Sequence, residues 1–324
     1  MTLLFMGPIF RGVADESHES VPWKLALPLL NQGARGGFDE TAVKDPSIVF
    51  YDGFWHLFFT ARGNGEYTTG YVRGKSLADL GEAKRYRLPT VRGESRYGCA
   101  PQIFYFAPQK IWYLIFQHRD ANYQPAYVTN ADIFDPTGWS EAKNLLRKDT
   151  ERRWIDFWVI CDAKHAYLFY TEAHRAVMFR RTALAQFPGG WSPAREAFTG
   201  VHEAVHIYKV ANRRQYDMIY ERNTGVGRSF GLARADALEG PWEKVTDAYA
   251  TGSQLVYQGQ GKRWTEMVSH GEALRSGYDQ HLEYNPRDGR WLIQGLRHAD
   301  AHVPYPALRW QLGIIERDDQ PLPE

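Results

Sequence analysis

Three carboxylates begin short hairpins of apolar and aromatic residues in this chain, namely Asp45, Asp156 and Glu203. A lone Asp or Glu is usually a solvated or salt-bridged surface residue. Three of them, each inside an apolar run where an unpaired charge is costly, indicate a functional set instead. Neighbouring carboxyl groups that cannot both ionise form one acid and one base. The sequence therefore predicts general acid–base hydrolysis, with these residues sharing the two roles.

The hairpins belong to a repeat that occurs five times. Their first residues are Asp45, Pro101, Asp156, Glu203 and His270. Successive first residues are 56, 55, 47 and 67 positions apart, and the second strand of the last hairpin is expected at residues 281–284. This period, with about four strand-like runs in each unit, is typical of a propeller blade. We therefore predict an all-β fold, a five-bladed β-propeller.

The repeat spans most of the chain, which predicts a single catalytic domain over residues 1–324. Residues 1–40 precede the first hairpin and form a lead-in segment. Strand-like runs lie near the two ends, at Val21–Leu25 and Trp310–Ile315. We expect the lead-in segment to pair with the last strand and to close the ring.

The innermost strand of each propeller blade lines the central channel. Residues that begin these strands should converge there, so we expect the three carboxylates to face one another together with His270. A lone histidine beside a strand is most often a hydrogen-bonded core residue. The alternative for His270 is a role in binding a metal ion or the substrate, and the sequence leaves both open.

Two cations lie close to these positions. Lys44 directly precedes Asp45, and Arg228 follows the glycine-containing loop at residues 225–227. Each could be an ordinary surface charge or a partner in a salt bridge. The functional alternative is that Lys44 binds a hydroxyl group and tunes Asp45, and that Arg228 clamps the substrate.

Composition argues against several other classes of protein. The chain carries 39 basic and 38 acidic side chains without a block of like charge, so we expect no nucleic-acid partner. No apolar run reaches the length of a membrane span, so we expect no membrane partner. The two cysteines, Cys99 and Cys161, have no metal-type spacing and are expected to be free thiols. We expect a monomer.

The first ten residues contain an apolar stretch, but no basic segment precedes it and no Ala-x-Ala cleavage site follows. The chain as written is therefore expected to be cytoplasmic. A chain from which an export signal had been removed would have the same sequence and would be secreted, so the location stays open.

Four stretches resemble family 62 of the glycoside hydrolases, the α-L-arabinofuranosidases. They cover residues 44–49, 100–110, 154–162 and 269–272, and the wider similarity runs from about residue 40 to about residue 315. The resemblance implies a five-bladed β-propeller that hydrolyses with inversion of configuration. It also implies a substrate, the α-L-arabinofuranosyl branches of arabinoxylan or arabinan.

Through this resemblance Asp45 corresponds to the base that activates water, and Glu203 corresponds to the general acid. Asp156 corresponds to the carboxylate that modulates the acid and orients the sugar. Inversion needs room for a water molecule, with acid and base roughly 6.5 to 9.5 Å apart. Opposed blades could provide that separation. The acid motif departs from the family pattern, because His202 precedes Glu203 and His206 follows it.

Lys44, Arg228 and Tyr305 correspond to residues that contact the sugar. Where the family usually has a Tyr-Asn pair, this chain has Tyr305-Pro306 and lacks one amide group. That departure leaves two alternatives open. One is a related five-bladed propeller glycosidase that acts on another pentoside, such as a β-xylosidase or an arabinanase. The other is a sugar-binding propeller without catalysis, which is disfavoured because all three carboxylates are present.

The resemblance also implies a metal ion. His270 corresponds to a histidine that helps to hold a structural Ca²⁺ ion in the central channel, largely through water. Gln117 and Gln280 are expected as outer partners of this ion.

Overall fold

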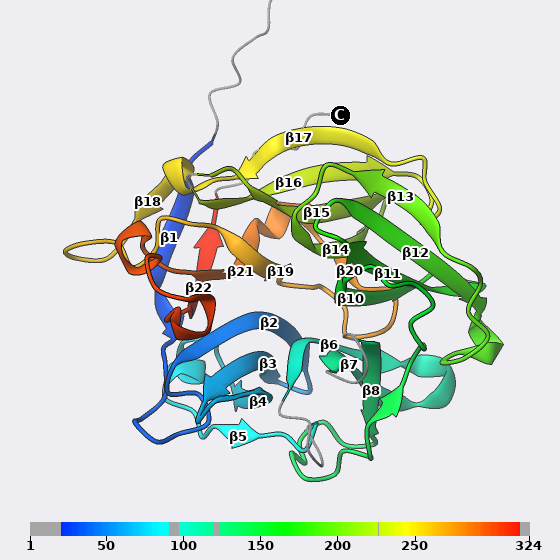
Figure 1. Cartoon of the computed structure of the whole chain (residues 1–324), viewed down its shortest axis with the longest axis horizontal. Coiled ribbons are helices and arrows are strands. Elements are labelled where there is room, and N and C mark those ends of the chain that lie inside the picture. Colours follow the sequence, from blue (N-terminus) through cyan, green and yellow to red (C-terminus); the bar gives the residue numbers. More distant parts are fainter. Residues whose placement is uncertain (1–20, 91–96, 119–123, 226, 318–324) are drawn as a thin grey trace, which may run out of the picture.

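The structure is a computed structural model that describes residues 21–90, 97–118, 124–225 and 227–317. Five sheets follow one another around a central axis in chain order, as Figure 1 shows. This arrangement confirms the predicted five-bladed β-propeller. No helix within the described ranges is long and apolar enough to cross a membrane.

Blades 1 to 3 each have four strands, and the strand that comes first in the chain is the innermost. Blade 1 contains β2 (Ala42–Tyr51), β3 (Phe54–Gly63), β4 (Glu66–Gly74) and β5 (Tyr86–Arg87). Blade 2 contains β6 (Gly98–Phe106), β7 (Ile111–His118), β8 (Gln124–Asn130) and β9 (Lys143–Asn144). Blade 3 contains β10 (Trp154–Cys161), β11 (His165–Glu172), β12 (Ala176–Ala183) and β13 (Arg195–Thr199).

Blades 4 and 5 each have five strands. Blade 4 contains β14 (Glu203–Val210), β15 (Tyr216–Asn223), β16 (Arg228–Ala235), β17 (Glu243–Ala250) and β20 (Glu283–Tyr284). Blade 5 contains β19 (Ser269–Ala273), β21 (Arg290–Gly295), β22 (Gln311–Glu316), β1 (Trp23–Leu30) and β18 (Leu255–Tyr257). Short 3-10 helices lie between strands, at Ala78–Gly81, Ala107–Gln109, Leu184–Gln186, Gly252–Gln254, Pro286–Asp288, His298–Asp300 and Tyr305–Ala307.

The fifth hairpin differs from the prediction. The partner of β19 is β21, whereas the run expected to be its second strand forms β20 and pairs in parallel with β14 of blade 4. The prediction was wrong because a short apolar run shows that a strand forms but does not identify its neighbour. The strand β20 therefore links blade 5 to blade 4.

The lead-in segment closes the ring, as predicted. The strand β1 pairs antiparallel with β22, with Leu25 opposite Ile315, and it pairs parallel with β18. Figure 1 shows β1 in blue between these two strands. Trp23 is fully buried, and its indole N–H donates to the Tyr249 carbonyl of blade 4 at 3.0 Å. An N-terminal strand thus completes a blade whose other strands come from the C-terminal part of the chain.

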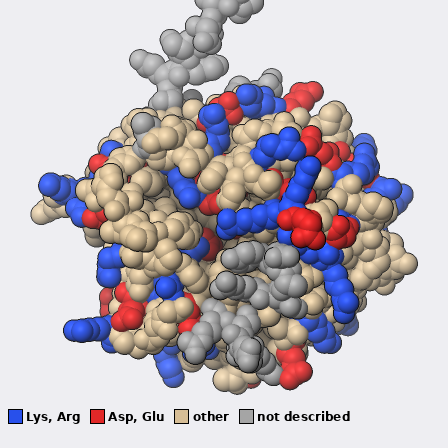
Figure 2. Space-filling model, viewed as in Figure 1, with Lys and Arg blue, Asp and Glu red and all other residues tan. Residues whose placement is uncertain are grey.

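Charged side chains are distributed over the surface. Figure 2 shows Lys and Arg side chains interspersed with Asp and Glu on the viewed face. Oppositely charged surface side chains form ion pairs, such as those of Arg181 and Arg195 with Glu239. Exposed pairs of this kind contribute little to stability.

A β-bulge marks the start of every innermost strand. The register shifts between Lys44 and Ser47, Cys99 and Gln102, Ile155 and Trp158, Glu203 and His206, and Ser269 and Gly271. In four blades the bulged residue has a φ between 47° and 56°, and these residues are Asp45, Ala100, Asp156 and Ala204. A bulge leaves one residue outside the ladder and re-aims its side chain. The bulges therefore present one residue per blade to the channel.

Side chains from other strands satisfy the N–H groups freed at the bulges. Each freed N–H donates to one side chain. The pairs are Asp45 to Gln294 (2.7 Å), Ala100 to Thr60 (2.8 Å), Asp156 to Gln117 (3.4 Å), Ala204 to Asp156 (2.8 Å) and His270 to Glu221 (3.0 Å). Four of these acceptors lie on the second strand of the preceding blade. A buried N–H left without a partner costs about 1–3 kcal/mol. This ring of hydrogen bonds thus joins neighbouring blades and orients the bulges.

Candidate active site

The predicted carboxylates meet at one end of the central channel. Asp45, Asp156 and Glu203 lie near the N-terminal ends of β2, β10 and β14. The ring of His270 lies between two of them, with Nδ1 3.4 Å from Asp45 Oδ1 and 4.0 Å from Asp156 Oδ1. The carboxylate of Asp156 accepts the N–H of Ala204, the residue after Glu203, at 2.8 Å. The structure therefore brings together the four residues that were expected to converge.

Glu203 is not equivalent in register to Asp45 and Asp156, contrary to the prediction. The bulged residue of blade 4 is Ala204, and Glu203 comes one residue earlier. Glu203 instead pairs across the ladder with Glu221 of β15. Spacing along the sequence could not reveal this shift, because a bulge moves the alignment by a single residue.

Asp45 is held as an anion. Lys44 Nζ donates to Asp45 Oδ2 at 2.7 Å, and both side chains are buried. Burial alone would raise the pKa of Asp45, but Lys44 and His270 outweigh burial and lower that pKa below its ordinary value. Lys44 Nζ also donates to the Tyr305 hydroxyl at 3.4 Å and lies 5.8 Å from the centre of the Tyr67 ring. Lys44 and Tyr305, both predicted to contact the sugar, thus stand beside the predicted base.

Asp156 is held as a neutral acid. Its burial and the negative charges of Glu203 and Asp45 raise the pKa of Asp156 to about 8. The hydrogen bond from the Ala204 backbone lowers this pKa, but it does not outweigh burial. Near neutral pH the site therefore holds a proton on Asp156, next to Glu203.

Arg228 contacts two carboxylates, Glu203 and Glu221. Burial opposes the ionisation of Glu203, but Arg228, with help from His202, lowers the pKa of Glu203 to about 2. Burial raises the pKa of Glu221 to about 7 against the opposing charge of Arg228. Arg228 therefore keeps Glu203 ionised in this arrangement. Glu203 can act as an acid only when that contact loosens.

Sequence reasoning missed two residues of this site. Glu221 is fully buried and accepts hydrogen bonds from Ser269 and from the backbone N–H of His270. An acidic residue within an apolar strand was the signal that could have identified it. His174 lies between β11 and β12, with Nδ1 3.5 Å from Glu203 Oε2. No local signal marks His174, because only the fold brings it to Glu203.

The residues predicted to hold calcium do not assemble a direct binding site. Gln280 lies at the other end of the channel, where its side chain accepts the Ala107 N–H at 2.9 Å. Gln117 Oε1 accepts the N–H of Asp156, and Gln117 Nε2 is buried without a hydrogen-bond partner in the described part of the chain. That Nε2 is a donor, which a cation would repel. Because Ca²⁺ prefers six to eight oxygen ligands, His270 and these amides do not fit direct coordination.

A polar cavity of about 430 Å³ adjoins the site at Arg228. Several of its lining residues carry hydroxyl groups, namely Thr224, Ser229, Thr251 and Ser253. Arg263 and Glu266 add charge to the same wall. Hydroxyl and charged groups are suited to hydrogen bonding with a polar ligand.

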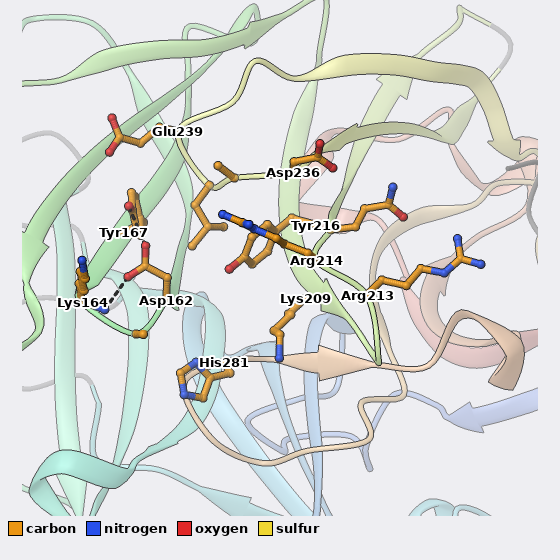
Figure 3. Close-up of a pocket in the computed structure, with 14 residues that line it drawn as sticks. Asp162, Lys164, Tyr167, Lys209, Arg213, Arg214, Tyr216, Asp236, Glu239 and His281 are labelled. Carbon is orange, nitrogen blue, oxygen red and sulfur yellow. Dashed lines mark hydrogen bonds between the residues drawn. The ribbon is translucent and has the colours of Figure 1, made fainter.

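A second cavity, of about 520 Å³, lies away from the carboxylates. It is lined at the C-terminal ends of β10 and β14, by Asp162 and Lys209 among others. Figure 3 shows Arg213 and Arg214 beside it, together with Tyr167. Because the predicted catalytic residues lie near the N-terminal ends of the same strands, this cavity is separate from the candidate active site.

Comparison with known proteins identifies relatives of the chain. The sequence model of glycosyl hydrolase family 62 matches residues 31–316. Alpha-L-arabinofuranosidase C of Cellvibrio japonicus (strain Ueda107) is 32% identical over 306 residues, which cover 90% of this chain and 46% of that protein. The chain thus spans about half the length of this relative.

Solved structures agree with this match. The catalytic domain of a family 62 α-L-arabinofuranosidase from Coprinopsis cinerea has a TM-score of 0.84 and 30% identity, over 92% of this chain and 97% of that one. An α-L-arabinofuranosidase from Podospora anserina, in complex with cellotriose, has a TM-score of 0.83 and 30% identity, over 93% of this chain and 98% of that one. The resemblance of the four sequence stretches is confirmed, and the chain belongs to glycosyl hydrolase family 62.

Proposed function

We propose that this protein is an inverting α-L-arabinofuranosidase that releases arabinofuranosyl branches from arabinoxylan- or arabinan-type saccharides. One observation carries the proposal. Carboxyl groups with opposite protonation preferences meet at one end of the channel, with Asp45 held ionised and Asp156 held protonated. Membership of family 62 and the named activities of its relatives support this reaction.

In the proposed reaction, Asp45 takes a proton from the water molecule that attacks the anomeric carbon. Lys44 favours the ionised form of Asp45, which a general base requires. Attack from the face opposite the leaving oxygen inverts the configuration in one step, without a covalent intermediate. Lys44 and Tyr305 stand beside Asp45 and are suited to hold the hydroxyl groups of the sugar.

Glu203 gives a proton to the leaving oxygen in this proposal. Arg228 is shared between Glu203 and Glu221, so a bound saccharide could shift Arg228 toward Glu221. A buried Glu203 that loses its cation has a higher pKa, because burial then dominates. Asp156 holds a proton close by and so modulates the acid.

The roles of acid and base can be separated with two leaving groups. A 4-nitrophenolate leaves without protonation, whereas a sugar oxygen needs an acid. Glu203→Gln should therefore lose roughly 100-fold or more in kcat/KM on an arabinoxylan oligosaccharide, but much less on 4-nitrophenyl α-L-arabinofuranoside. Asp45→Asn should lose activity on both substrates, because both need an activated water molecule.

Equal losses by Glu203→Gln on the two substrates would show that Glu203 is not the acid. Proton NMR of the first sugar formed by the unaltered protein should show the β-anomer. An initial α-anomer would exclude inversion and the proposed role of Asp45.

The second candidate function is hydrolysis of another pentoside. The observation that favours this candidate is Pro306. The Pro306 carbonyl accepts a hydrogen bond from Arg62 Nε at 3.4 Å, and Tyr305 beside it reaches Lys44. A proline at this place cannot supply the amide group that the family pattern has. Higher kcat/KM on 4-nitrophenyl β-D-xyloside than on the α-L-arabinofuranoside would favour the second candidate.

We also propose that a structural calcium ion is bound near His270 through water. The ionised carboxylate of Asp45 lies 3.4 Å from His270 Nδ1 and would attract a cation. Treatment with EDTA should then lower Tm, and calcium should restore it. An unchanged Tm would exclude a structural calcium ion.

A further inference from the structure

Two histidines flank the carboxylate of Glu203. His174 Nδ1 lies 3.5 Å from Glu203 Oε2, and His202 Nε2 lies 3.9 Å from the same oxygen. The two imidazole rings are stacked, with 4.7 Å between their centres. Within the described part of the chain, this is the only group of three His, Cys, Asp or Glu residues whose ligand atoms all lie within 4.8 Å of one another.

Local backbone structure holds this group in place. His202 immediately precedes β14, and His174 occupies the turn between β11 and β12 with a φ of 52°. His174 Nδ1 also lies 3.2 Å from the His202 carbonyl oxygen. The His174 and His202 side chains are 31% and 22% exposed, so an ion in solution can reach them.

We propose that His174, His202 and Glu203 form a binding site for a transition-metal ion such as Zn²⁺, and that the bound ion inhibits the enzyme. Two imidazoles and one carboxylate are the protein ligands of known His₂Glu zinc sites. Ligand atoms at about 2.0–2.1 Å from a tetrahedral zinc ion lie about 3.4 Å apart. The observed distances of 3.5 and 3.9 Å are close to this value. His174 would exchange its contact with the His202 carbonyl for the metal.

The ligand types determine which ions the site selects. Imidazole nitrogens favour Zn²⁺, Co²⁺, Ni²⁺ and Cu²⁺, whereas Ca²⁺ and Mg²⁺ prefer oxygen ligands. Calcium should therefore neither occupy this site nor compete with zinc there. This separates the site from the proposed calcium position near His270.

The expected inhibition depends on which oxygen of Glu203 each neighbouring side chain contacts. Arg228 donates to Glu203 Oε1, and the two histidines approach Oε2. A metal ion on Oε2 occupies the oxygen that Arg228 leaves free, and it keeps a positive charge on the carboxylate when Arg228 moves toward Glu221. Glu203 then cannot take up the proton for the leaving group. The inhibition therefore rests on the proposed role of Glu203 as the acid, whereas metal binding by itself does not.

Metal binding and inhibition can be measured separately on the full chain. Protein freed of metal with EDTA and then of EDTA is titrated with ZnCl₂ by calorimetry, and with Co²⁺ by visible absorption, which reports tetrahedral coordination. Release of arabinose from an arabinoxylan oligosaccharide, whose leaving oxygen needs an acid, is then followed at increasing Zn²⁺. His174→Gln and His202→Gln should each raise the Kd for Zn²⁺, and the Zn²⁺ concentration for half-inhibition, roughly tenfold or more.

The matched control is His165→Gln. His165 is a partly buried histidine at the other end of the strand that leads to His174, and it lies outside the candidate active site. This variant should bind Zn²⁺ and be inhibited like the unaltered protein. Inhibition is expressed relative to the turnover of each variant without metal, and circular dichroism checks that each variant is folded.

Two results would overturn the metal site. One is the absence of Zn²⁺ binding at about 100 µM. The other is an unchanged Kd in both histidine variants, which would place the ion elsewhere. Binding that depends on both histidines but leaves turnover unchanged would refute the inhibition. A protein inactive on every arabinofuranoside would contradict the proposed function, and the calorimetric titration would still decide whether the metal site exists.

Discussion

Asp45 and Asp156 are the same amino acid at equivalent bulges, yet they prefer opposite protonation states. Lys44 donates to Asp45 and keeps it ionised, whereas Asp156 is buried beside two other anions and keeps its proton. Glu203, the third carboxylate, is kept ionised by its ion pair with Arg228. At this scale the chemistry depends on which charge each carboxyl group touches.

The raised pKa of Asp156 predicts a pH-dependent cost in stability. The unfolded chain has the ordinary pKa of 3.8 and the native state a pKa of about 8, so the native state binds the extra proton between these values. Stability must therefore fall as pH rises through this window. Asp156→Asn removes the effect, so its Tm should match the unaltered protein near pH 4 and exceed it by a few degrees near pH 8.

Thermal denaturation of both proteins across this pH range measures the difference. Turnover should fall in the variant at every pH, because the residue that modulates the acid is lost. A gain in Tm that does not depend on pH would show that Asp156 is ionised in the native state.

At the scale of the elements, the bulges at the starts of the innermost strands position the candidate active site. The N–H of Asp45 donates to Gln294 Oε1 at 2.7 Å, and Gln294 Nε2 donates to Ser269 at 3.0 Å. Two residues beyond the bulged Ala100, Gln102 makes a comparable bridge to the backbone of Val159, at 2.7 Å in both directions. Both glutamines are buried and join two blades, but only Gln294 holds a predicted catalytic residue.

This pair provides a matched test of positioning. Gln294→Leu and Gln102→Leu each remove a buried inter-blade bridge and should cost about 1–3 kcal/mol of stability. Only Gln294→Leu should also reduce kcat, by roughly tenfold or more, because Asp45 loses the support that orients it. The kcat values of the two variants are compared at equal fractions of folded protein, which separates positioning of Asp45 from stability. Equal losses in kcat in Gln294→Leu and Gln102→Leu would assign Gln294 a purely structural role.

At the scale of the whole molecule, the ring is closed by a strand from the N-terminal side. Trp23 of β1 is fully buried against the core, whereas Leu27 on the same strand is 62% exposed. Trp23→Ala should cost about 3–5 kcal/mol. Leu27→Ala should stay within about 0.5 kcal/mol. Urea unfolding would measure both, and similar small losses would show that closure by β1 contributes little to stability.

The sequence alone determined more about the fold of this protein than about its candidate active site. The sequence alone determined the five-bladed architecture, because apolar hairpins at a blade-like period can bury their faces only against one another. It also predicted Asp45, Asp156 and Glu203 as the catalytic set, since a carboxylate inside an apolar run is costly unless it has a function. Pairing of the lead-in segment with the last strand followed from the same strand pattern.

Other features depended on contacts between segments far apart in the chain. The bulge at Ala204 moved Glu203 out of register with the other carboxylates, and Gln280 lies at the other end of the channel from His270. The partners of Glu203, which are Arg228 and His174, come from two different blades. Protonation depends on burial and on the charges within a few ångströms. Only the tertiary structure decides those neighbours, so it alone determined which carboxyl group holds the proton.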